Sequence, residues 1–180
     1  MKLHMALALA TVAFAHKGNA QNLIPFNSGF ELGSPAGWYM WIDEKSQGNA
    51  SFESTDEEAH SGSYSLRFDV KREAREFWQI GLIPPKWDAK PYTRYRVHFW
   101  AKGSGPLKVG ATDVDKGYAW LGGFDANVSG GQWTEVSGEI STSSQSGTGR
   151  VSVALELGNA SGRFYFDDMA IEEIGPLPAQ

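Results

Sequence analysis

Apolar and polar side chains alternate along several short segments of this chain, with the period of two that is typical of a strand with one buried face. The alternation is clearest in residues 93–102 and 150–157. We expect the apolar members to face a core and the polar members to face outward. The inward set is Tyr95, Val97, Phe99, Ala101, Val151, Val153, Leu155 and Leu157, and the outward set is Arg94, Arg96, His98, Lys102, Ser152, Ala154 and Glu156.

Ten segments carry strand signals, and clusters of Gly, Pro and Ser separate them. No stretch beyond the first twenty residues shows a sustained helical period. Short strands joined by tight turns predict an all-β fold, an antiparallel β-sandwich of the jelly-roll kind. The predicted strands are 38–43, 50–54, 63–71, 76–82, 93–102, 107–114, 118–122, 133–140, 150–157 and 163–172.

The first twenty residues differ from the rest. Lys2 precedes an apolar run that is too short to span a membrane, and small residues follow it. This pattern predicts a signal peptide over residues 1–20, cleaved after Ala20 or, as a competing site, after Ala15. The mature protein would then be secreted or periplasmic, with residues 21–180 as a single domain.

Charge and cysteine content narrow the functional classes. Loss of the leader leaves 14 basic against 21 acidic residues, a net charge of −7, which argues against nucleic-acid and anionic-membrane partners. The chain has no cysteine, so an exported fold must be held by its core or by a metal. We expect it to work as a monomer.

Five motifs in order give the chain a family resemblance. They are Asn27-Ser28-Gly29-Phe30-Glu31 followed by Gly37-Trp38, then His60-Ser61-Gly62-Ser63-Tyr64-Ser65-Leu66, residues 95–102, and Phe164-Tyr165-Phe166-Asp167-Asp168-Met169. The order resembles carbohydrate-binding modules of families 4, 9, 16 and 22 over about residues 22–173. The resemblance implies a jelly roll that binds glycan in a groove on its concave sheet and often carries one structural calcium.

Aromatic side chains are the main functional signal, at 13% of the residues with seven Trp. Flat rings stack on the C–H faces of sugars with little loss of side-chain entropy. The resemblance favours Trp41 and Tyr118 as opposing sugar platforms, and Trp120 extends the surface. We expect Trp38 and Trp78 in the core. The alternative is that all these rings fill the core.

Three polar residues are candidates for the floor of the groove. Gln79, Lys108 and Glu156 each alternate with apolar neighbours and so point away from the core. Sugar hydroxyls need both donors and acceptors, which this set provides. The resemblance places their strands in the concave sheet. The alternative for each is an ordinary solvated side chain.

The resemblance also implies a metal site. Asp167 would supply carboxylate oxygen to a Ca²⁺ ion, Gly29 and Gly62 would supply carbonyls, and Glu31 would add charge. Oxygen donors of this kind are what calcium prefers. Alternatively, Asp167 and Glu31 are ordinary residues at strand ends.

We therefore expect non-catalytic binding of a polysaccharide chain, with a β-linked plant or algal glycan as the ligand. A structural or adhesion sandwich without sugar binding is the second class. An enzyme is the third: Glu156 and Asp113 could form a glycosidase pair, and Tyr118 or His98 could serve as the base of a lyase. His98 is expected on the convex side, away from the groove.

Overall fold

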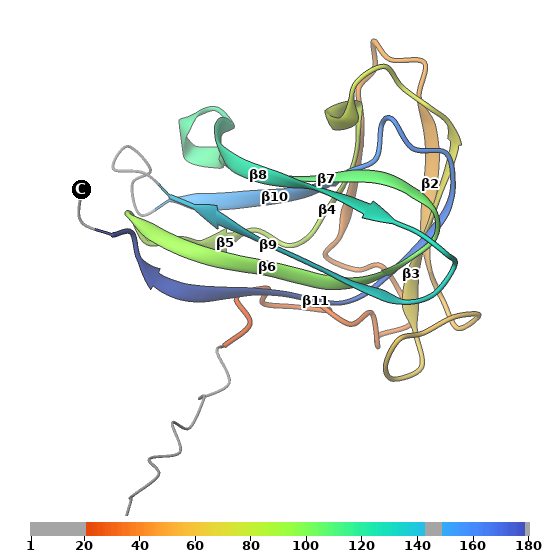
Figure 1. The fold of residues 1–180 in the computed structure, drawn as a ribbon, viewed down its shortest axis with the longest axis horizontal. Helices are drawn as coiled ribbons and strands as arrows, with labels where there is room; N and C mark the ends of the chain where they lie inside the picture. The colour runs from red at the N-terminus through yellow and green to blue at the C-terminus, as the bar shows by residue number, and fades with distance from the viewer. Residues whose placement is uncertain (1–20, 143–148, 179–180) are drawn as a thin grey trace, which may run out of the picture.

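Two antiparallel sheets stack face to face in the computed structural model, which describes residues 21–142 and 149–178 (Figure 1). The expected leader lies outside these residues. The strands are β1 (Tyr39–Ile42), β2 (Asn49–Thr55), β3 (Ser65–Arg72), β4 (Ile80–Ile83), β5 (Trp87–Asp88), β6 (Thr93–Lys102), β7 (Gly105–Asp113), β8 (Ala119–Val128), β9 (Thr134–Ser141), β10 (Arg150–Glu156) and β11 (Gly162–Pro176).

Sheet A has the order β1-β4-β10-β7-β8, with β5 also paired to β10, and sheet B has the order β2-β3-β11-β6-β9. All the pairings are antiparallel, which confirms the predicted sandwich. In the described part of the chain, the helical segments are two 3₁₀ turns, η1 (Phe77–Gln79) and η2 (Val114–Lys116). None of the described helices is long and apolar enough to cross a membrane.

The core between the sheets is built as the alternation predicts. All eight residues expected to face inward on 93–102 and 150–157 are buried, and so is Trp38. Trp78 is a correction: it lies in η1 rather than in a strand, and 51% of its surface is exposed. The expected strand over 76–82 begins only at Ile80, because the preceding residues form the 3₁₀ turn.

The N-terminal segment is attached to the last strand. The backbone N–H of Leu23 donates to the Ile171 carbonyl at 2.7 Å, and that of Met169 donates to the Ser28 carbonyl at 3.0 Å. The Asn22 amide adds two contacts of 3.0 Å, to the Met169 carbonyl and the Ile171 N–H. Residues 22–30 therefore close the sandwich against β11.

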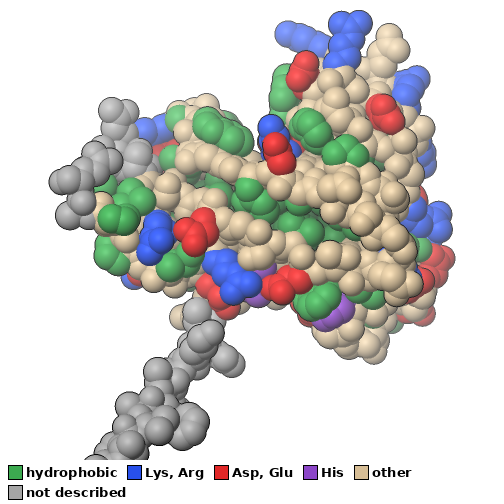
Figure 2. All heavy atoms as spheres, viewed as in Figure 1, with side chains coloured by type: hydrophobic (Ala, Val, Ile, Leu, Met, Phe, Trp, Pro, Cys, Tyr) green, Lys and Arg blue, Asp and Glu red, His purple; other side chains and the backbone are tan. Residues whose placement is uncertain are grey.

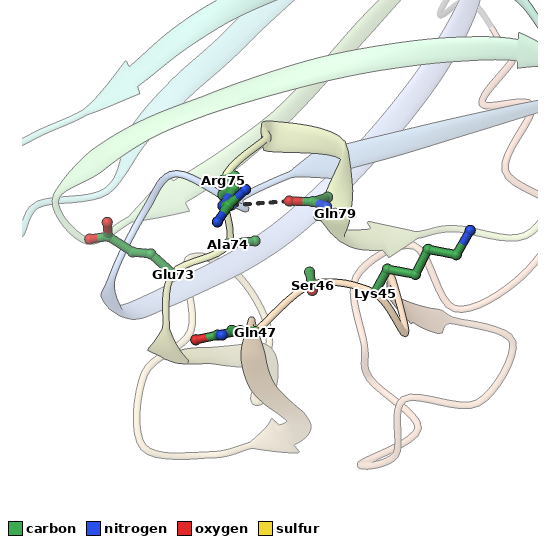
Figure 3. Close-up of a pocket in the computed structure, with 7 residues that line it drawn as sticks. All are labelled: Lys45, Ser46, Gln47, Glu73, Ala74, Arg75 and Gln79. Atoms are coloured by element: carbon green, nitrogen blue, oxygen red, sulfur yellow. Dashed lines mark hydrogen bonds between the residues drawn. The ribbon is translucent and has the colours of Figure 1, made fainter.

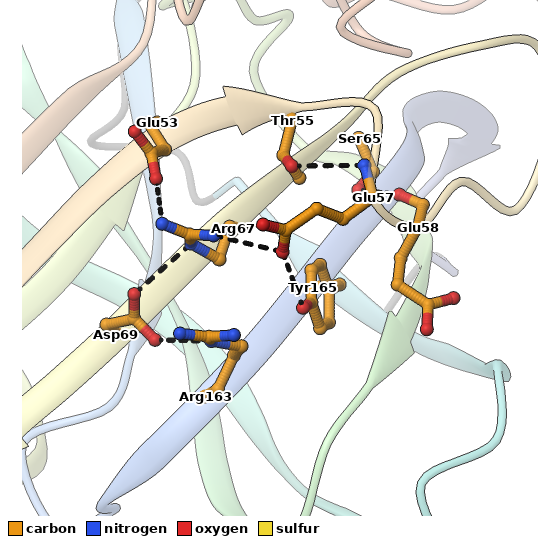
Figure 4. A network of polar contacts seen from close by, with 9 residues as sticks. All are labelled: Glu53, Thr55, Glu57, Glu58, Ser65, Arg67, Asp69, Arg163 and Tyr165. Carbon is orange, nitrogen blue, oxygen red and sulfur yellow. Dashed lines mark hydrogen bonds and ion pairs between the residues drawn. The ribbon is translucent and has the colours of Figure 1, made fainter.

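The outer face of sheet B is covered by ion pairs (Figure 4). Arg67 contacts Glu53, donates to Glu57 at 3.0 Å and lies 3.3 Å from Asp69. Arg163 donates to the other Asp69 oxygen at 2.8 Å. Exposed pairs of this kind add little stability, about 0–1 kcal/mol each. Their effect is to keep this face charged and solvated.

Candidate functional site

The outer face of sheet A has a floor of small side chains. Strand register places Trp41, Gly81, Glu156, Lys108 and Asp125 in one row across the sheet. By the same pairings the next row runs from Tyr39 through Ile83, Ala154 and Gly110 to Gly123. Small residues thus stand beside Glu156 and Lys108 on the middle strands, whereas the flanking strands carry rings.

Aromatic rings stand on both sides of this floor. Trp41 on β1 is 40% exposed and Trp120 on β8 is 59% exposed. Figure 2 shows the surface hollowed between the η2 and η1 ends of the sheet. We call this feature, with its floor of Gly81, Ala154, Gly110 and Gly123 and its walls of Trp41 and Trp120, the groove.

A β-bulge turns Trp120 toward the groove. The β7–β8 register shifts between Ala111 and Thr112, so that Trp120 pairs with Thr112 on the groove side while Leu121 packs against the core. Gly122, at a φ of +134°, makes this irregularity possible. Bulges of this kind re-aim side chains beside functional sites.

Two glycines let the Trp120 ring lie against the floor. A Cβ on Gly110 would lie 2.9 Å from Cζ3 of Trp120 and 2.6 Å from Oε1 of Glu156. A Cβ on Gly123 would lie 2.9 Å from Cη2 of Trp120. The indole therefore rests over these glycines, next to the Glu156 carboxylate.

The row through Glu156 carries alternating charge. The Lys108 ammonium lies 3.3 Å from Asp125 and 5.5 Å from the centre of the Phe77 ring. Glu156 is only 9% exposed, and this burial raises the pKa of its carboxyl, while the nearby Lys108 ammonium opposes part of the rise. The floor thus offers one fixed cation and one largely desolvated acceptor.

Tyr118 lies just before β8, and its ring is 59% exposed. Its backbone has a φ of +62°, a strained value for a residue other than glycine, and Gly117 before it has +65°. The Lys86 ammonium sits 5.5 Å from the ring centre and 3.4 Å from the Tyr118 hydroxyl. Lys86 therefore lies over one side of this ring.

Gln79 does not lie free on the floor as expected. Its Oε1 accepts from the N–H group of Arg75 at 3.0 Å (Figure 3). The same oxygen accepts from the Glu76 N–H at 3.0 Å, and Nε2 donates to Asp43 at 2.8 Å. The amide thus closes the η1 turn in the manner of a helix capping residue. Its side chain therefore holds the local structure beyond Trp41, and a sugar contact by Gln79 stays a prediction.

The structure separates the acid–base pairs considered from the sequence. Asp113 is buried and has the same orientation as the other core-facing residues of β7. Glu156 pairs with Lys108, which lies five residues before Asp113 on β7 and therefore points to the groove side. The two carboxylates therefore lie on opposite faces of sheet A. His98 is on β6 in sheet B, where Glu135 and Glu172 each lie 3.7 Å from its ring nitrogens. It is on the far sheet, as expected.

The expected metal residues converge on one loop. The fully buried Asp167 carboxylate accepts from the N–H groups of His60 at 2.9 Å and Ser61 at 3.2 Å, and Glu31 accepts from Ser63 and Tyr64 at about 3.0 Å. A Cβ on Gly62 would lie 2.3 Å from Glu31 Oε1, so the loop backbone meets this carboxylate closely.

Desolvation raises the pKa of Asp167 to about 6. A cation would favour its charged form, and the donors are all oxygens, which fits calcium. Within 21–142 and 149–178, no three His, Cys, Asp or Glu side chains form a metal-binding group. A calcium ion here would therefore need backbone carbonyls, such as those of Gly29 and Gly62.

A comparison with known protein families gives a match over most of the chain. The family model "Carbohydrate binding domain" matches residues 22–162. The chain belongs to this family of carbohydrate-binding domains. The match covers all of sheet A and every strand of sheet B except β11, which begins where it ends, and it includes every residue of the groove named above.

Individual relatives support the family and the fold. The domain is 31% identical over 153 residues to endo-1,4-beta-xylanase A of Thermoanaerobacterium saccharolyticum, covering 81% of this chain but 12% of that protein. A solved family 4 carbohydrate-binding module superposes with a TM-score of 0.66 at 15% identity, over 82% of this chain and 98% of its own. A Stig cyclase of Fischerella sp. TAU superposes with a TM-score of 0.64 at 16% identity, over 88% and 100%.

Several neighbours of the groove were not predicted from the sequence. Asp125 pairs with Lys108, Phe77 lies under the same ammonium, and Lys86 contacts Tyr118. The Gly122-Gly123 pair was the available signal for a bulge within the strand. The contacts of Phe77 and Lys86 depend on long-range pairing that a single sequence does not reveal.

Proposed function

We propose that the domain binds a single polysaccharide chain without transforming it, with a β-linked backbone lying in the groove between Trp41 and Trp120. The exposed indole of Trp120, seated on Gly110 and Gly123 beside Glu156, is the observation that carries the proposal. Exposed rings of this size are costly to maintain in a soluble domain unless a ligand covers them. Membership of the carbohydrate-binding family supports the same conclusion.

The polar groups of the groove suit a sugar chain. Rings can stack on its C–H faces, while the Lys108 ammonium donates to hydroxyls and the Glu156 carboxylate accepts from them. The small floor residues leave room for a chain to lie between the two rings. Because the curated relative is an endo-1,4-beta-xylanase, we propose a 1,4-linked plant glycan such as xylan as the first ligand to test.

Hydrolysis of the polysaccharide is the alternative function, because two carboxylates stand in the row through Glu156. Glu156 and Asp125 flank Lys108 at two strand spacings, roughly 10 Å apart. That is near the upper limit for the carboxylates of an inverting glycosidase. The cyclase similarity shows that a fold of this kind does not decide function. We favour binding, because the Asp125 side chain is 81% exposed and pairs with Lys108.

The test is a binding survey with the mature domain. Affinity electrophoresis against soluble xylan, β-glucan, mannan and alginate would find the ligand, and calorimetry would give its Kd. We expect Trp120→Ala to weaken binding by about tenfold or more, since tenfold corresponds to roughly 1.4 kcal/mol and a stacked ring contributes on that order. The fold should persist, because the ring lies outside the core.

Tyr118 is the other ring expected to contact the sugar, so Tyr118→Ala should also weaken binding, and Tyr92→Ala is its matched control. Both tyrosines are exposed, at 54% and 59%, and both have a positive φ, but Tyr92 precedes a strand of sheet B. Binding that survives Trp120→Ala and Trp41→Ala unchanged would overturn the groove assignment. Release of reducing ends from the bound polysaccharide, abolished by Glu156→Gln, would establish the enzyme instead.

We also propose that the domain is exported, with residues 1–20 as its leader. The short apolar run of the leader and the small residues that follow it support this. Mass spectrometry of protein from the medium or periplasm should show an N-terminus at Gln21 or, at the competing site, at His16. Intact Met1 on exported protein would contradict the leader.

A structural calcium is the remaining proposal, with oxygens from Asp167, Glu31, Gly29 and Gly62. The desolvated Asp167 carboxylate and the close approach of the Gly62 backbone to Glu31 support it. The ion would supply positive charge that holds the 60–64 loop to the first segment and the last strand. It would act on stability rather than on the groove.

A further inference from the structure

A second hollow lies just beyond the Trp41 end of the groove, between the 43–48 turn and the 73–79 segment (Figure 3). It encloses about 360 Å³, which is within the range of small-ligand sites. The hollow is lined by Lys45, Ser46, Gln47, Glu73, Ala74, Arg75 and Gln79.

The hollow continues the groove. Asp43 and Trp41 are two residues apart in and just after β1, and so are Gln79 and Gly81 at the start of β4. The backbone N–H of Asp43 donates to the Gln79 carbonyl at 2.9 Å, which extends the β1–β4 pairing by one step. A chain that leaves the groove past Trp41 would therefore meet this hollow next.

The inner wall is held by its own hydrogen bonds. The Ser46 hydroxyl donates to the Asp43 carbonyl at 2.8 Å and accepts from the Gly48 N–H at 3.2 Å. The Gln79 amide is engaged by Arg75 N–H, Glu76 N–H and Asp43. These contacts keep the hollow open without a ligand, so little ordering is needed on binding.

The rim, in contrast, has side-chain ends free to bind. Across 21–142 and 149–178, no ion pair or side-chain hydrogen bond engages the Arg75 guanidinium, the Lys45 ammonium or the Glu73 carboxylate. In Figure 3, Lys45 and Glu73 extend in opposite directions, and Arg75 lies between them beside Gln79. The central charged group is therefore a guanidinium.

Donors outnumber acceptors on this rim. Arg75 offers five N–H donors and Lys45 three, against the two oxygens of Glu73. A ligand group rich in acceptors fits that excess, and a guanidinium matches the planar geometry of a carboxylate. A neutral sugar hydroxyl both donates and accepts hydrogen bonds, so it satisfies fewer of these surplus donors than a carboxylate does.

We propose that this hollow is a subsite for the carboxylate of an acidic sugar, carried as a uronic-acid substituent on the polysaccharide in the groove. The inference rests on the proposed function and adds to it a preference for acidic over neutral forms of one glycan. Arg75 is the recognising residue, Lys45 adds to its field, and Glu73 opposes it.

The experiment compares glucuronoxylan with the same polymer after chemical reduction of its carboxyl groups to alcohols. Calorimetry should show the wild-type domain binding the native polymer about fivefold more tightly, which corresponds to roughly 1 kcal/mol, the upper range for an exposed ion pair. Arg75→Gln should remove this difference and leave the affinity for the reduced polymer unchanged. Salt should diminish the difference in the wild type.

Two further variants make the test specific. Glu73→Gln removes the opposing charge, so the preference for the native polymer should widen. Lys71→Gln removes one exposed cation outside the hollow and should change nothing. Equal affinity of the wild type for both polymers would overturn the inference, and so would equal losses in Arg75→Gln and Lys71→Gln. Failure to bind either polymer would instead overturn the proposed function for xylan, and the subsite with it.

Discussion

Gly110 is the residue that most directly allows Trp120 to lie on the floor of the groove. A side chain at this position would collide with both the indole and the Glu156 carboxylate. We predict that Gly110→Ala displaces the ring and weakens binding of the survey ligand by about tenfold, a change of roughly 1.4 kcal/mol. Calorimetry on the variant measures this, with circular dichroism to show that the sandwich persists.

Gly81→Ala is the control for that variant. It places a methyl group on the same floor, but the nearest atoms are 3.8 and 3.9 Å away, which is ordinary contact. We expect a smaller loss of affinity. If both variants weaken binding equally, filling of the floor rather than displacement of Trp120 is the cause.

Glu156 should make stability depend on pH. Burial raises its folded-state pKa above the ordinary 4.5. At a pH between 4.5 and the folded-state pKa, the folded protein therefore binds more protons than the unfolded one. Stability must therefore fall as pH rises through that window. We predict that Glu156→Gln melts at a higher temperature than wild type at pH 7, and that the gap narrows as pH falls to about 4.

The matched comparison is Asp125→Asn, which removes an exposed carboxylate from the same row. That variant should change the melting temperature little at either pH, because its carboxylate remains largely solvated. A Glu156→Gln variant that melts lower than wild type at pH 7 would show that pairing with Lys108 outweighs the cost of burial.

At the scale of elements, η1 is where the sequence pattern misleads. Trp78-Gln79-Ile80 alternates like a strand, but the Gln79 amide satisfies the Arg75 and Glu76 N–H groups and tightens the chain into a 3₁₀ turn. We predict that Gln79→Ala lowers the free energy of unfolding by about 1 kcal/mol, the usual effect of losing a capping contact. Urea denaturation measures this.

The same variant separates a structural role from a direct contact in the groove. Binding of a neutral polysaccharide by Gln79→Ala should stay within about twofold of wild type, a change well below 1 kcal/mol. Gln47→Ala, another amide on the rim of the hollow, should leave stability unchanged because no side-chain hydrogen bond engages it in the described chain. A tenfold loss of neutral-glycan affinity in Gln79→Ala alone would show that Gln79 contacts the glycan directly.

Period-two alternation predicts β6 and β10 well because one face of each is packed in the core and the other is polar. It fails for β8, where the bulge at Gly122 breaks the period and the strand continues to Val128, past the predicted end at 122. The exposure of Trp41 and Tyr118 was predicted, because the core had fewer places for them. The seating of Trp120 on Gly110 was not, since it depends on the β7–β8 register.

At the scale of the molecule, the two sheets divide the chemistry. The outer face of sheet B carries paired charges beside the stacked rings of His60 and Trp100, whereas the outer face of sheet A carries more exposed rings over small residues and one charged row. A charged, solvated face resists association, and a face with exposed rings invites a ligand. This contrast supports the proposal that a glycan binds to sheet A.

The loop at residues 60–64 links the first segment to the last strand, and its stability should depend on calcium. With no disulfide available, a metal that binds only the folded state stabilises it by mass action, by about 2.7 kcal/mol at a hundredfold excess over Kd. For a domain of this size that is roughly 5–10 °C in Tm. We predict that EDTA lowers the Tm of the wild type by this amount and that added calcium, but not magnesium, restores it.

Asp167→Asn isolates the metal from the carboxylate's other contacts. The variant loses stability in any case, because the His60 and Ser61 N–H groups depend on that side chain. The informative quantity is therefore the difference in Tm with and without EDTA, which should vanish in Asp167→Asn and shrink in Glu31→Gln. Asp69→Asn, on the outer face of sheet B, should keep the full difference.

A wild-type Tm that does not change on addition of EDTA would mean that backbone N–H groups alone hold the Asp167 and Glu31 carboxylates. The loop would then be stabilised by hydrogen bonds without an ion, and glycan binding in the groove should be the same in either case.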